Sequence, residues 1–180
     1  MRADAQRNRD AVLAAAGRLF DAATSSDEVS MDAVAVAAGV GKGTLFRRFG
    51  DRTGLIRELY QHRSEEMENT WTPVPEGSPA ERALDLLLVI LRFKTENRAL
   101  SRALEGTGRT SPYDNRSYDR WHSTLASIVA EVRDAPEAAF LAHAMLAAVR
   151  SDLLEHLRLW PEDRIRGGVE ALVRSILEDQ

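Results

Sequence analysis

The chain has 180 residues, of which 44% are hydrophobic and 29% charged, the balance of a globular protein with an apolar core. It contains no cysteine, which excludes disulfides and thiolate metal sites and fits a reducing cytoplasm. The longest apolar run, residues 84–91, is too short to span a bilayer, and the N-terminus lacks the apolar stretch of a secretion signal, so we expect a cytoplasmic protein without a membrane partner.

The net charge of −4 conceals an uneven distribution of charged side chains. Residues 1–60 hold nine Lys/Arg against eight Asp/Glu (+1), whereas residues 61–180 hold fifteen against twenty (−5). Residues 40–60 alone hold five against two. A local basic cluster in an acidic chain is typical of a small DNA-contacting segment, although plain solvated helices also carry such clusters.

Helix-forming residues, with apolar side chains at three- and four-residue spacing, predict an all-α protein. In the N-terminal part we expect helices at about residues 6–23, 31–38, 42–48 and 52–70. Ser30 and Asp51 are expected to cap the second and fourth of these helices, and Gly39 to end the second.

Proline, glycine and serine gather at residues 71–81, which predicts a linker and a domain boundary. After the linker we expect helices at about 82–104, 118–132, 134–160 and from Pro161 onward, with a loop at 105–115.

The segment 31–48, two short helices joined at a glycine, predicts a helix-turn-helix. Ala35 is small enough for the two helices to cross closely, and Gly39 allows the positive φ that the turn requires. Leu45 and Phe49 are four residues apart, so we expect both to point from the second of these helices into the core.

The other side chains of that helix suit a major groove, which admits one α-helix. Gly43 would let the backbone approach DNA, Thr44 offers a hydroxyl and a methyl group, and Arg47 can fork onto guanine. Lys42 and Arg48 are better suited to phosphates. Two alternatives stay open: a phosphate-binding loop, although GVGKGT lacks the required spacing and a preceding strand, and a solvated basic helical turn.

The stretch SMDAVAVAAGVGKGTLFRRFGDRTGLIRELY, residues 30–60, closely resembles the DNA-binding segment of the TetR (tetracycline-repressor-like) family, and the resemblance covers about residues 8–60. It implies an N-terminal three-helix helix-turn-helix head, joined by a long helix to a C-terminal helical bundle. We accordingly expect a helix-turn-helix DNA-binding domain at residues 1–50 and a ligand-sensing and dimerisation domain at residues 51–180.

The segment departs from the family pattern at two positions. Phe46 stands where the family usually has Tyr, which removes a hydroxyl able to bond phosphate, and Arg48 stands where it often has His. Arg48 can supply a charge-assisted bond instead, and Arg52 takes the place of the family's phosphate-binding Lys, at a helix N-terminus that itself favours phosphate. The predicted DNA-binding residues are Ser30, Lys42, Gly43, Thr44, Phe46, Arg47, Arg48, Arg52 and Thr53.

The C-terminal domain is expected to sense a ligand and to form a homodimer. An alanine-rich side at residues 139–160 would allow close helix approach, and two helices paired with their symmetry mates would form a four-helix interface. The predicted dimer interface is Leu146, Val149, Leu153, Leu157, Val169, Leu172 and Ile176. The alternative is that these residues pack within one chain.

A ligand pocket between helices would be mostly apolar with a few polar groups. The candidate ligand-binding residues are Met67, Leu87, Leu91, Phe93, Tyr118, Trp121, His122 and Leu125. Each of them also suits an ordinary core position.

We therefore expect a sequence-specific DNA-binding transcriptional regulator: a dimeric repressor released from a palindromic operator by a small-molecule effector. We predict no cofactor, catalytic residue or metal site, and no enzymatic activity, because the histidines lack metal-ligand spacing and no nucleophile stands beside a base. The alternative is a ligand-binding or interaction protein of the same fold whose DNA binding is weak or lost, which Phe46 keeps open.

Overall fold

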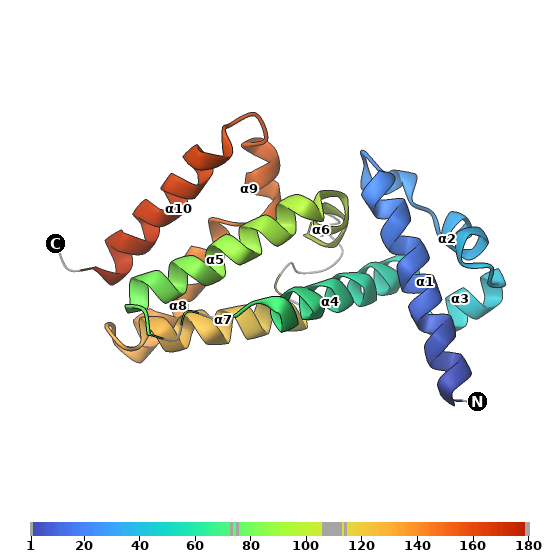
Figure 1. Ribbon diagram of the computed structural model, residues 1–180, viewed down its shortest axis with the longest axis horizontal. Coiled ribbons are helices and arrows are strands. Elements are labelled where there is room, and N and C mark those ends of the chain that lie inside the picture. The colour runs from blue at the N-terminus through green and yellow to red at the C-terminus, as the bar shows by residue number, and fades with distance from the viewer. Residues whose placement is uncertain (1, 73, 75, 106–112, 114, 179–180) are drawn as a thin grey trace. The chain divides into compact units, whose positions relative to one another are not determined.

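The computed structural model of the protein describes residues 2–72, 74, 76–105, 113 and 115–178 (Figure 1). Every regular element in this part of the chain is a helix, which confirms the all-α prediction. None of these helices is both long and apolar enough to cross a membrane. In chain order the elements are α1 (Arg2–Ala22), the short 3-10 helix η1 (Ser26–Glu28), α2 (Met31–Ala38), α3 (Lys42–Phe49), α4 (Arg52–Thr70), α5 (Pro79–Glu96), α6 (Arg98–Glu105), α7 (Arg116–Val129), α8 (Ala135–Ala147), α9 (Ser151–His156) and α10 (Glu162–Leu177).

The chain divides into two compact units, which we call the head and the body. The head comprises the residues up to Ser64 together with α6, and the body comprises residues 65–96 together with the residues from α7 onward. Helix α4 begins in the head and continues into the body. The assignment of DNA binding to residues 1–50, and of ligand sensing to residues 51–180, stays a prediction.

The head is built from α1 to α4 around a core of aliphatic and aromatic side chains. Helix α1 packs against α2, and α2 packs against α3. Burial of these side chains is the main stabilising term for helices too short to be stable alone. The core side chains of the head include Val12, Leu13, Phe20, Val34, Leu45, Phe49, Leu55, Ile56 and Leu59.

The three residues predicted to cap or end helices in the head are confirmed in these roles. The Ser30 hydroxyl oxygen accepts a hydrogen bond from the Ala33 N–H at 3.1 Å and caps α2. Gly39 ends α2 in the left-handed conformation, with φ 67° and ψ 29°. A carboxylate oxygen of Asp51 accepts a hydrogen bond from the Gly54 N–H at 2.8 Å and caps α4.

The junction between α3 and α4 requires a residue without a side chain at position 54. A Cβ atom added to Gly54 would lie 2.0 Å from the carbonyl oxygen of Phe49, a backbone atom that cannot move away alone. The first turn of α4 therefore lies directly against the carbonyl end of α3.

In the body, α7 packs against α8, and α5 packs against both α7 and α10. The long apolar helix predicted after the linker supplies much of this core, because α5 buries residues on most of its sides. The connection between α4 and α5, residues 71–78, also belongs to the body.

Two of the helix predictions are wrong, because each predicted helix is two helices. The helix expected at 82–104 breaks at Asn97, a poor helix former whose side chain accepts a hydrogen bond from Arg63 at 2.6 Å. The helix expected at 134–160 breaks before Arg150, whose backbone is extended (φ −69°, ψ 145°) and whose guanidinium pairs with Asp152. Most of the loop expected at 105–115 lies outside the described residues.

Candidate nucleic-acid interface

Helix α3 has the buried face and the exposed face that its sequence predicts. Leu45 and Phe49 are buried in the head, as their spacing predicts. The other six residues of the helix are exposed: Lys42, Gly43, Thr44, Phe46, Arg47 and Arg48. Neither Arg47 nor Arg48 has an ion-pair partner among the described residues, so both guanidinium groups are available to an anionic partner.

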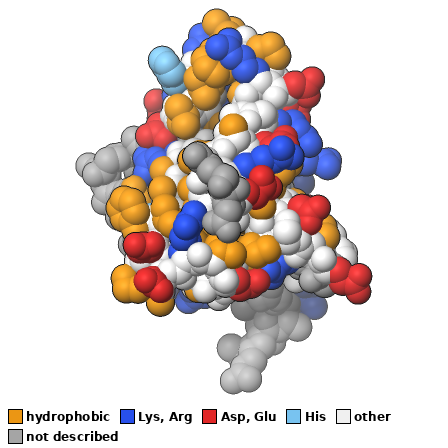
Figure 2. All heavy atoms as spheres, turned by 90° about the vertical axis from the view of Figure 1, so that its left-hand side faces the viewer, with side chains coloured by type: hydrophobic (Ala, Val, Ile, Leu, Met, Phe, Trp, Pro, Cys, Tyr) orange, Lys and Arg blue, Asp and Glu red, His pale blue; other side chains and the backbone are white. Residues whose placement is uncertain are grey.

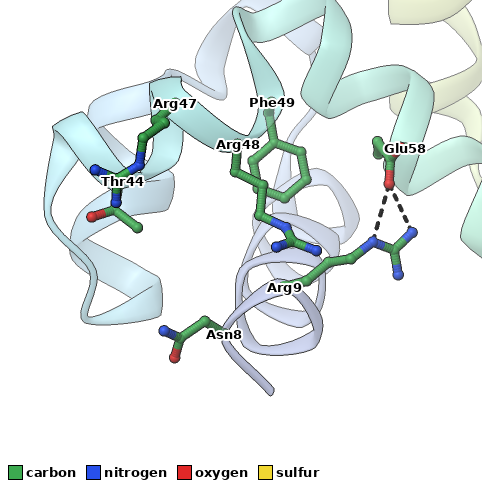
Figure 3. Close-up of a pocket in the computed structure, with 7 residues that line it drawn as sticks. All are labelled: Asn8, Arg9, Thr44, Arg47, Arg48, Phe49 and Glu58. Atoms are coloured by element: carbon green, nitrogen blue, oxygen red, sulfur yellow. Dashed lines mark hydrogen bonds and ion pairs between the residues drawn. The ribbon is translucent and has the colours of Figure 1, made fainter. Parts of the chain in front are cut away.

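Beside this helix the head contains a pocket of about 580 Å³, formed by residues of α1, α3 and α4 (Figure 3). The lining residues are Asn8, Arg9, Thr44, Arg47, Arg48, Phe49 and Glu58. Three arginines against one glutamate leave the lining with a formal charge of +2. The pocket and the exposed face of α3 share Thr44, Arg47 and Arg48, so we treat them as one basic surface.

Three of the lining residues were not predicted from the sequence: Asn8, Arg9 and Glu58. The Nε and Nη2 atoms of Arg9 donate to Oε2 of Glu58 at 3.1 and 2.7 Å. The two residues are 49 positions apart, and no periodicity in a single sequence connects such distant positions.

Lys42, a predicted phosphate ligand, forms an ion pair on the surface of the head. Its Nζ atom lies 2.7 Å from a carboxylate oxygen of Asp32 and 5.9 Å from the centre of the Phe46 ring. Both partners of the ion pair are well exposed, and exposed pairs are weak. Lys42 can therefore exchange Asp32 for a phosphate at small cost.

Arg52, another predicted phosphate ligand, makes hydrogen bonds within the head. Its guanidinium turns towards the backbone of the preceding loop and donates to the carbonyl oxygens of Ser26 and Val29, the latter at 2.9 Å. Because carbonyl oxygens at the end of a helix keep acceptor capacity, this half-buried arginine can tie η1 to α4. Of the other two residues predicted near the helix starts, Ser30 caps α2 and Thr53 lies half-buried in the first turn of α4.

At position 43, no steric contact among the described residues requires a glycine. A Cβ atom added there would meet no other atom within 4 Å. The absence of a side chain therefore serves no packing contact among the described residues, and it leaves the backbone of α3 open to a partner at this point.

In the body, most of the candidate ligand-binding residues occupy core positions. Leu87, Leu91, Phe93, Tyr118, Trp121 and Leu125 are buried, whereas Met67 and His122 are half-buried. Phe93 and Trp121 pack edge to face with their ring centres 6.1 Å apart. The Trp121 Nε1–H donates to Glu68 at 2.8 Å, and Glu68 also accepts two hydrogen bonds from Arg120 at 2.8 and 3.1 Å.

A cluster of aromatic and imidazole rings joins α7 to α8. The His122 and His143 rings stack with centres 3.8 Å apart, and His122 Nε2 bonds the Ala139 carbonyl at 3.0 Å. The Tyr118 hydroxyl lies 2.6 Å from His143 Nδ1. Burial against these rings, and secondly the charge of His122, hold the pKa of His143 below its ordinary value of 6.5.

The lowered pKa of His143 predicts that the body loses stability on acidification. As the pH falls below about 6.5 the unfolded chain takes up a proton that the folded chain resists, and the loss levels off below the folded pKa. We expect the free energy of unfolding to fall less between pH 7.5 and 5.5 in His143→Gln than in the unmodified chain, measured by urea denaturation. An equal fall in both proteins would contradict the assignment.

The predicted dimer interface divides into buried and exposed residues. Leu146, Val149 and Val169 are buried within the single chain and offer little surface to a partner. Leu153 is exposed, and Leu157, Leu172 and Ile176 are half-buried. Hydrophobic side chains are also exposed among charged ones on the face drawn in Figure 2. In α8 and in the connection between α9 and α10, the largest exposed apolar side chains are Phe140 (72% exposed), Leu159 (84%) and Trp160 (42%).

Among the described residues, no group of three or more His, Asp or Glu side chains is arranged to hold a metal ion. The described sites offer guanidinium groups on the head, and a packed aromatic core with two histidines in the body.

Comparison with known proteins finds relatives of the head and of the whole fold. Residues 12–59 match the family model of bacterial regulatory proteins, tetR family. An HTH-type transcriptional regulator of Staphylococcus aureus strain USA300 is 30% identical over 121 residues, which is 66% of this chain and 65% of that relative. The chain thus covers slightly less than two thirds of that relative's length.

Solved structures of low identity share the fold over nearly the whole chain. A transcriptional regulator from Rhodococcus sp. Rha1 aligns with a TM-score of 0.75 at 18% identity, covering 94% of this chain and 96% of its own. The TetR-like transcriptional regulator LfrR from Mycobacterium smegmatis, solved in complex with proflavine, aligns with a TM-score of 0.58 at 17% identity, covering 98% and 99%. At these identities the similarity shows the fold.

Proposed function

We propose that the chain, whose residues 12–59 match the family model of bacterial regulatory proteins, tetR family, is a sequence-specific DNA-binding transcriptional regulator. The observation that carries the proposal is the exposed face of α3. Among the described residues, Arg47 and Arg48 have no carboxylate partner, and no packing contact requires a glycine at position 43. A helix with this face fits a major groove: its guanidinium groups can bond guanine or phosphate, and Gly43 allows close approach.

In the proposed regulator, two chains bind a palindromic operator. A single head offers few base contacts, whereas a dimer reads two half-sites about one helical turn apart. The exposed apolar side chains Phe140, Leu153, Leu159 and Trp160 support a surface for the second chain. With three of the predicted interface residues buried, these exposed side chains replace them in the proposed interface.

A small-molecule effector would act through the body. LfrR, a protein of the same fold, was solved with proflavine, which supports a ligand site in this class of structure. In this chain α4 carries Arg63, bonded to Asp21 of the head at 2.7 and 2.8 Å, and Glu68, bonded to Arg120 and Trp121 of the body. A ligand that displaces the hydrogen bonds of Glu68 would favour a conformation of α4 that does not bind the operator. Operator affinity would then fall by the ratio of the ligand's affinities for the non-binding and the binding conformation.

The experiment that tests this function is a titration of a duplex with the purified chain at several salt concentrations. A regulator that contacts phosphates gives a steep negative dependence of the binding constant on salt, and a preferred sequence that competes against random duplex. Binding without sequence preference, or no binding, would favour the alternative of a ligand-binding or interaction protein of this fold.

That alternative rests on Phe46, which is 39% exposed and carries no hydroxyl. If α3 contacts the DNA backbone, Phe46→Tyr adds a hydroxyl that can donate a hydrogen bond to a phosphate. We expect operator affinity to rise by about 1 kcal/mol, the net worth of one hydrogen bond, with unchanged thermal stability. The comparison is a pair of titrations on the same duplex. An affinity that does not change would mean that position 46 faces away from phosphate.

A further inference from the structure

We propose that Arg9 of α1 and Arg48 of α3 together bind one phosphate of the DNA backbone, and that Glu58 of α4 is the residue that positions Arg9 for this contact. This inference rests on the proposed function and adds a helix outside the helix-turn-helix to the DNA-binding surface.

The first observation is the direction of the two guanidinium groups. Figure 3 shows Arg9 and Arg48 reaching from different helices into the same pocket, with the Arg9 guanidinium turned towards Glu58. Two cations that line one pocket repel each other, and an anion bound between them would relieve this repulsion. Arg48 has no carboxylate partner in the described residues, so the positive charge at its end of the pocket is not balanced within the chain.

The second observation is how Arg9 is held. Both of its hydrogen bonds to the glutamate go to one oxygen, Oε2 of Glu58, and they use Nε and one N–H of Nη2. The guanidinium keeps further N–H donors for a second partner. Asp10 lies 3.6 Å from Nη1, beyond hydrogen-bond distance, and accepts a hydrogen bond from Gln6 instead. Arg9 is thus fixed in direction by Glu58 with donors to spare.

The third observation is the position of the pocket. It shares Thr44, Arg47 and Arg48 with the exposed face of α3 that we propose to enter the major groove. When a helix lies in the major groove, the DNA phosphates that flank the groove lie beside that helix. Phosphate contacts of this kind fix the register of a DNA-binding protein. Asn8, the neighbouring lining residue of α1, offers an amide that can bond the same backbone.

The substitution Glu58→Gln tests the positioning role, because the two explanations predict opposite changes in DNA affinity. If only net charge mattered, Glu58→Gln would remove a negative charge near a polyanion and tighten DNA binding. If Glu58 positions Arg9, the same substitution weakens binding, by roughly threefold, because it releases a side chain that an exposed ion pair holds only moderately. Arg9→Ala weakens binding by roughly tenfold and lowers the slope against log salt by about 0.9, the loss of one phosphate contact.

The experiment measures affinity for one selected duplex at several salt concentrations for the unmodified chain, Arg9→Ala, Glu58→Gln and the double variant. Matched controls are Arg92→Ala and Glu96→Gln, which make the same charge changes in an exposed ion pair of α5. Circular dichroism checks that each variant is folded. We expect the double variant to bind like Arg9→Ala, and both controls to bind like the unmodified chain.

Several outcomes would overturn the inference. Arg9→Ala binding as tightly as the unmodified chain, or Glu58→Gln binding more tightly, would remove the phosphate contact or the positioning role. Saturable binding of inorganic phosphate in the absence of DNA, lost in Arg9→Ala while DNA affinity is unchanged, would assign the pocket to a free anion. An unmodified chain that binds no duplex would instead overturn the proposed function itself, and this contact with it.

Discussion

Replacement of Gly54 by alanine is expected to destabilise the chain by about 3 kcal/mol, the upper end of what overpacking costs. The reason is steric: the added Cβ would stand 2.0 Å from the Phe49 carbonyl oxygen, and relief requires the start of α4 to move away from the end of α3. The free energy of unfolding, from urea denaturation followed by circular dichroism, measures this loss. We also expect DNA affinity to fall in the fraction that remains folded, because relief of this overlap moves the end of α3 relative to the start of α4.

The matched control is Gly43→Ala, a glycine eleven positions earlier in a helix. There the added Cβ meets no atom within 4 Å, and alanine favours the helix by up to about 1 kcal/mol. We expect Gly43→Ala to be at least as stable as the unmodified chain and yet to bind DNA less tightly, because the methyl group occupies the space of close approach. If Gly54→Ala unfolds at the same urea concentration as the unmodified chain, the account of the α3–α4 junction is wrong.

Replacement of Arg47 by alanine is expected to weaken binding to the preferred duplex by about 1–3 kcal/mol and to relax sequence preference at one position of each half-site. Arg47 has no ion-pair partner to lose among the described residues, so its removal should leave the free energy of unfolding within about 0.5 kcal/mol. Competition titrations with duplexes changed at single positions measure both the loss and the relaxation.

Arg92→Ala, the same substitution in the body, provides the comparison for general charge effects. An equal loss of affinity for every duplex would show that Arg47 contacts the backbone and does not read a base. A variant that binds like the unmodified chain would exclude Arg47 from the DNA-binding surface and contradict the placement of α3 in the groove.

The sequence sufficed for the features that depend on local chemistry. The caps at Ser30 and Asp51, the left-handed Gly39, and the inward direction of Leu45 and Phe49 all follow from a few neighbouring residues. These features determine α2, α3 and the face that α3 exposes. For the same reason the position of the candidate DNA-binding helix follows from the amino-acid sequence alone.

The features that depend on tertiary contacts were missed. In the sequence, Arg52 has the pattern of an exposed basic residue at the start of a helix. In the structure its guanidinium donates hydrogen bonds to carbonyl oxygens of η1 and its cap, and η1 is too short to be recognised from helix periodicity. Arg9 and Glu58 meet across 49 positions. The breaks at Asn97 and before Arg150 lie in short polar segments between helices whose apolar periodicity continues on both sides, so the spacing of apolar residues does not show them. Asn97 is bonded by Arg63, 34 positions away, and Arg150 bonds Tyr113, 37 positions away, as well as its neighbour Asp152.

The dimer residues show a further limit of periodicity. An apolar stripe indicates that one side of a helix is covered, but it does not indicate whether the covering residues belong to the same chain. Leu146, Val149 and Val169 are covered by their own chain, whereas Leu159 and Trp160, outside any stripe, are exposed. Interfaces are therefore better proposed from exposed apolar side chains than from the pattern alone.

The central claim is that the exposed face of α3 reads a DNA sequence. The most direct test is a selection of bound fragments from the source genome at physiological salt, run in parallel with the unmodified chain and with Arg47→Ala. The account predicts that the unmodified chain recovers a palindromic site and that the variant loses it or recovers it with one position of each half-site degenerate. Recovery of no sequence above background, or of the same sharply defined site by both proteins, would contradict it.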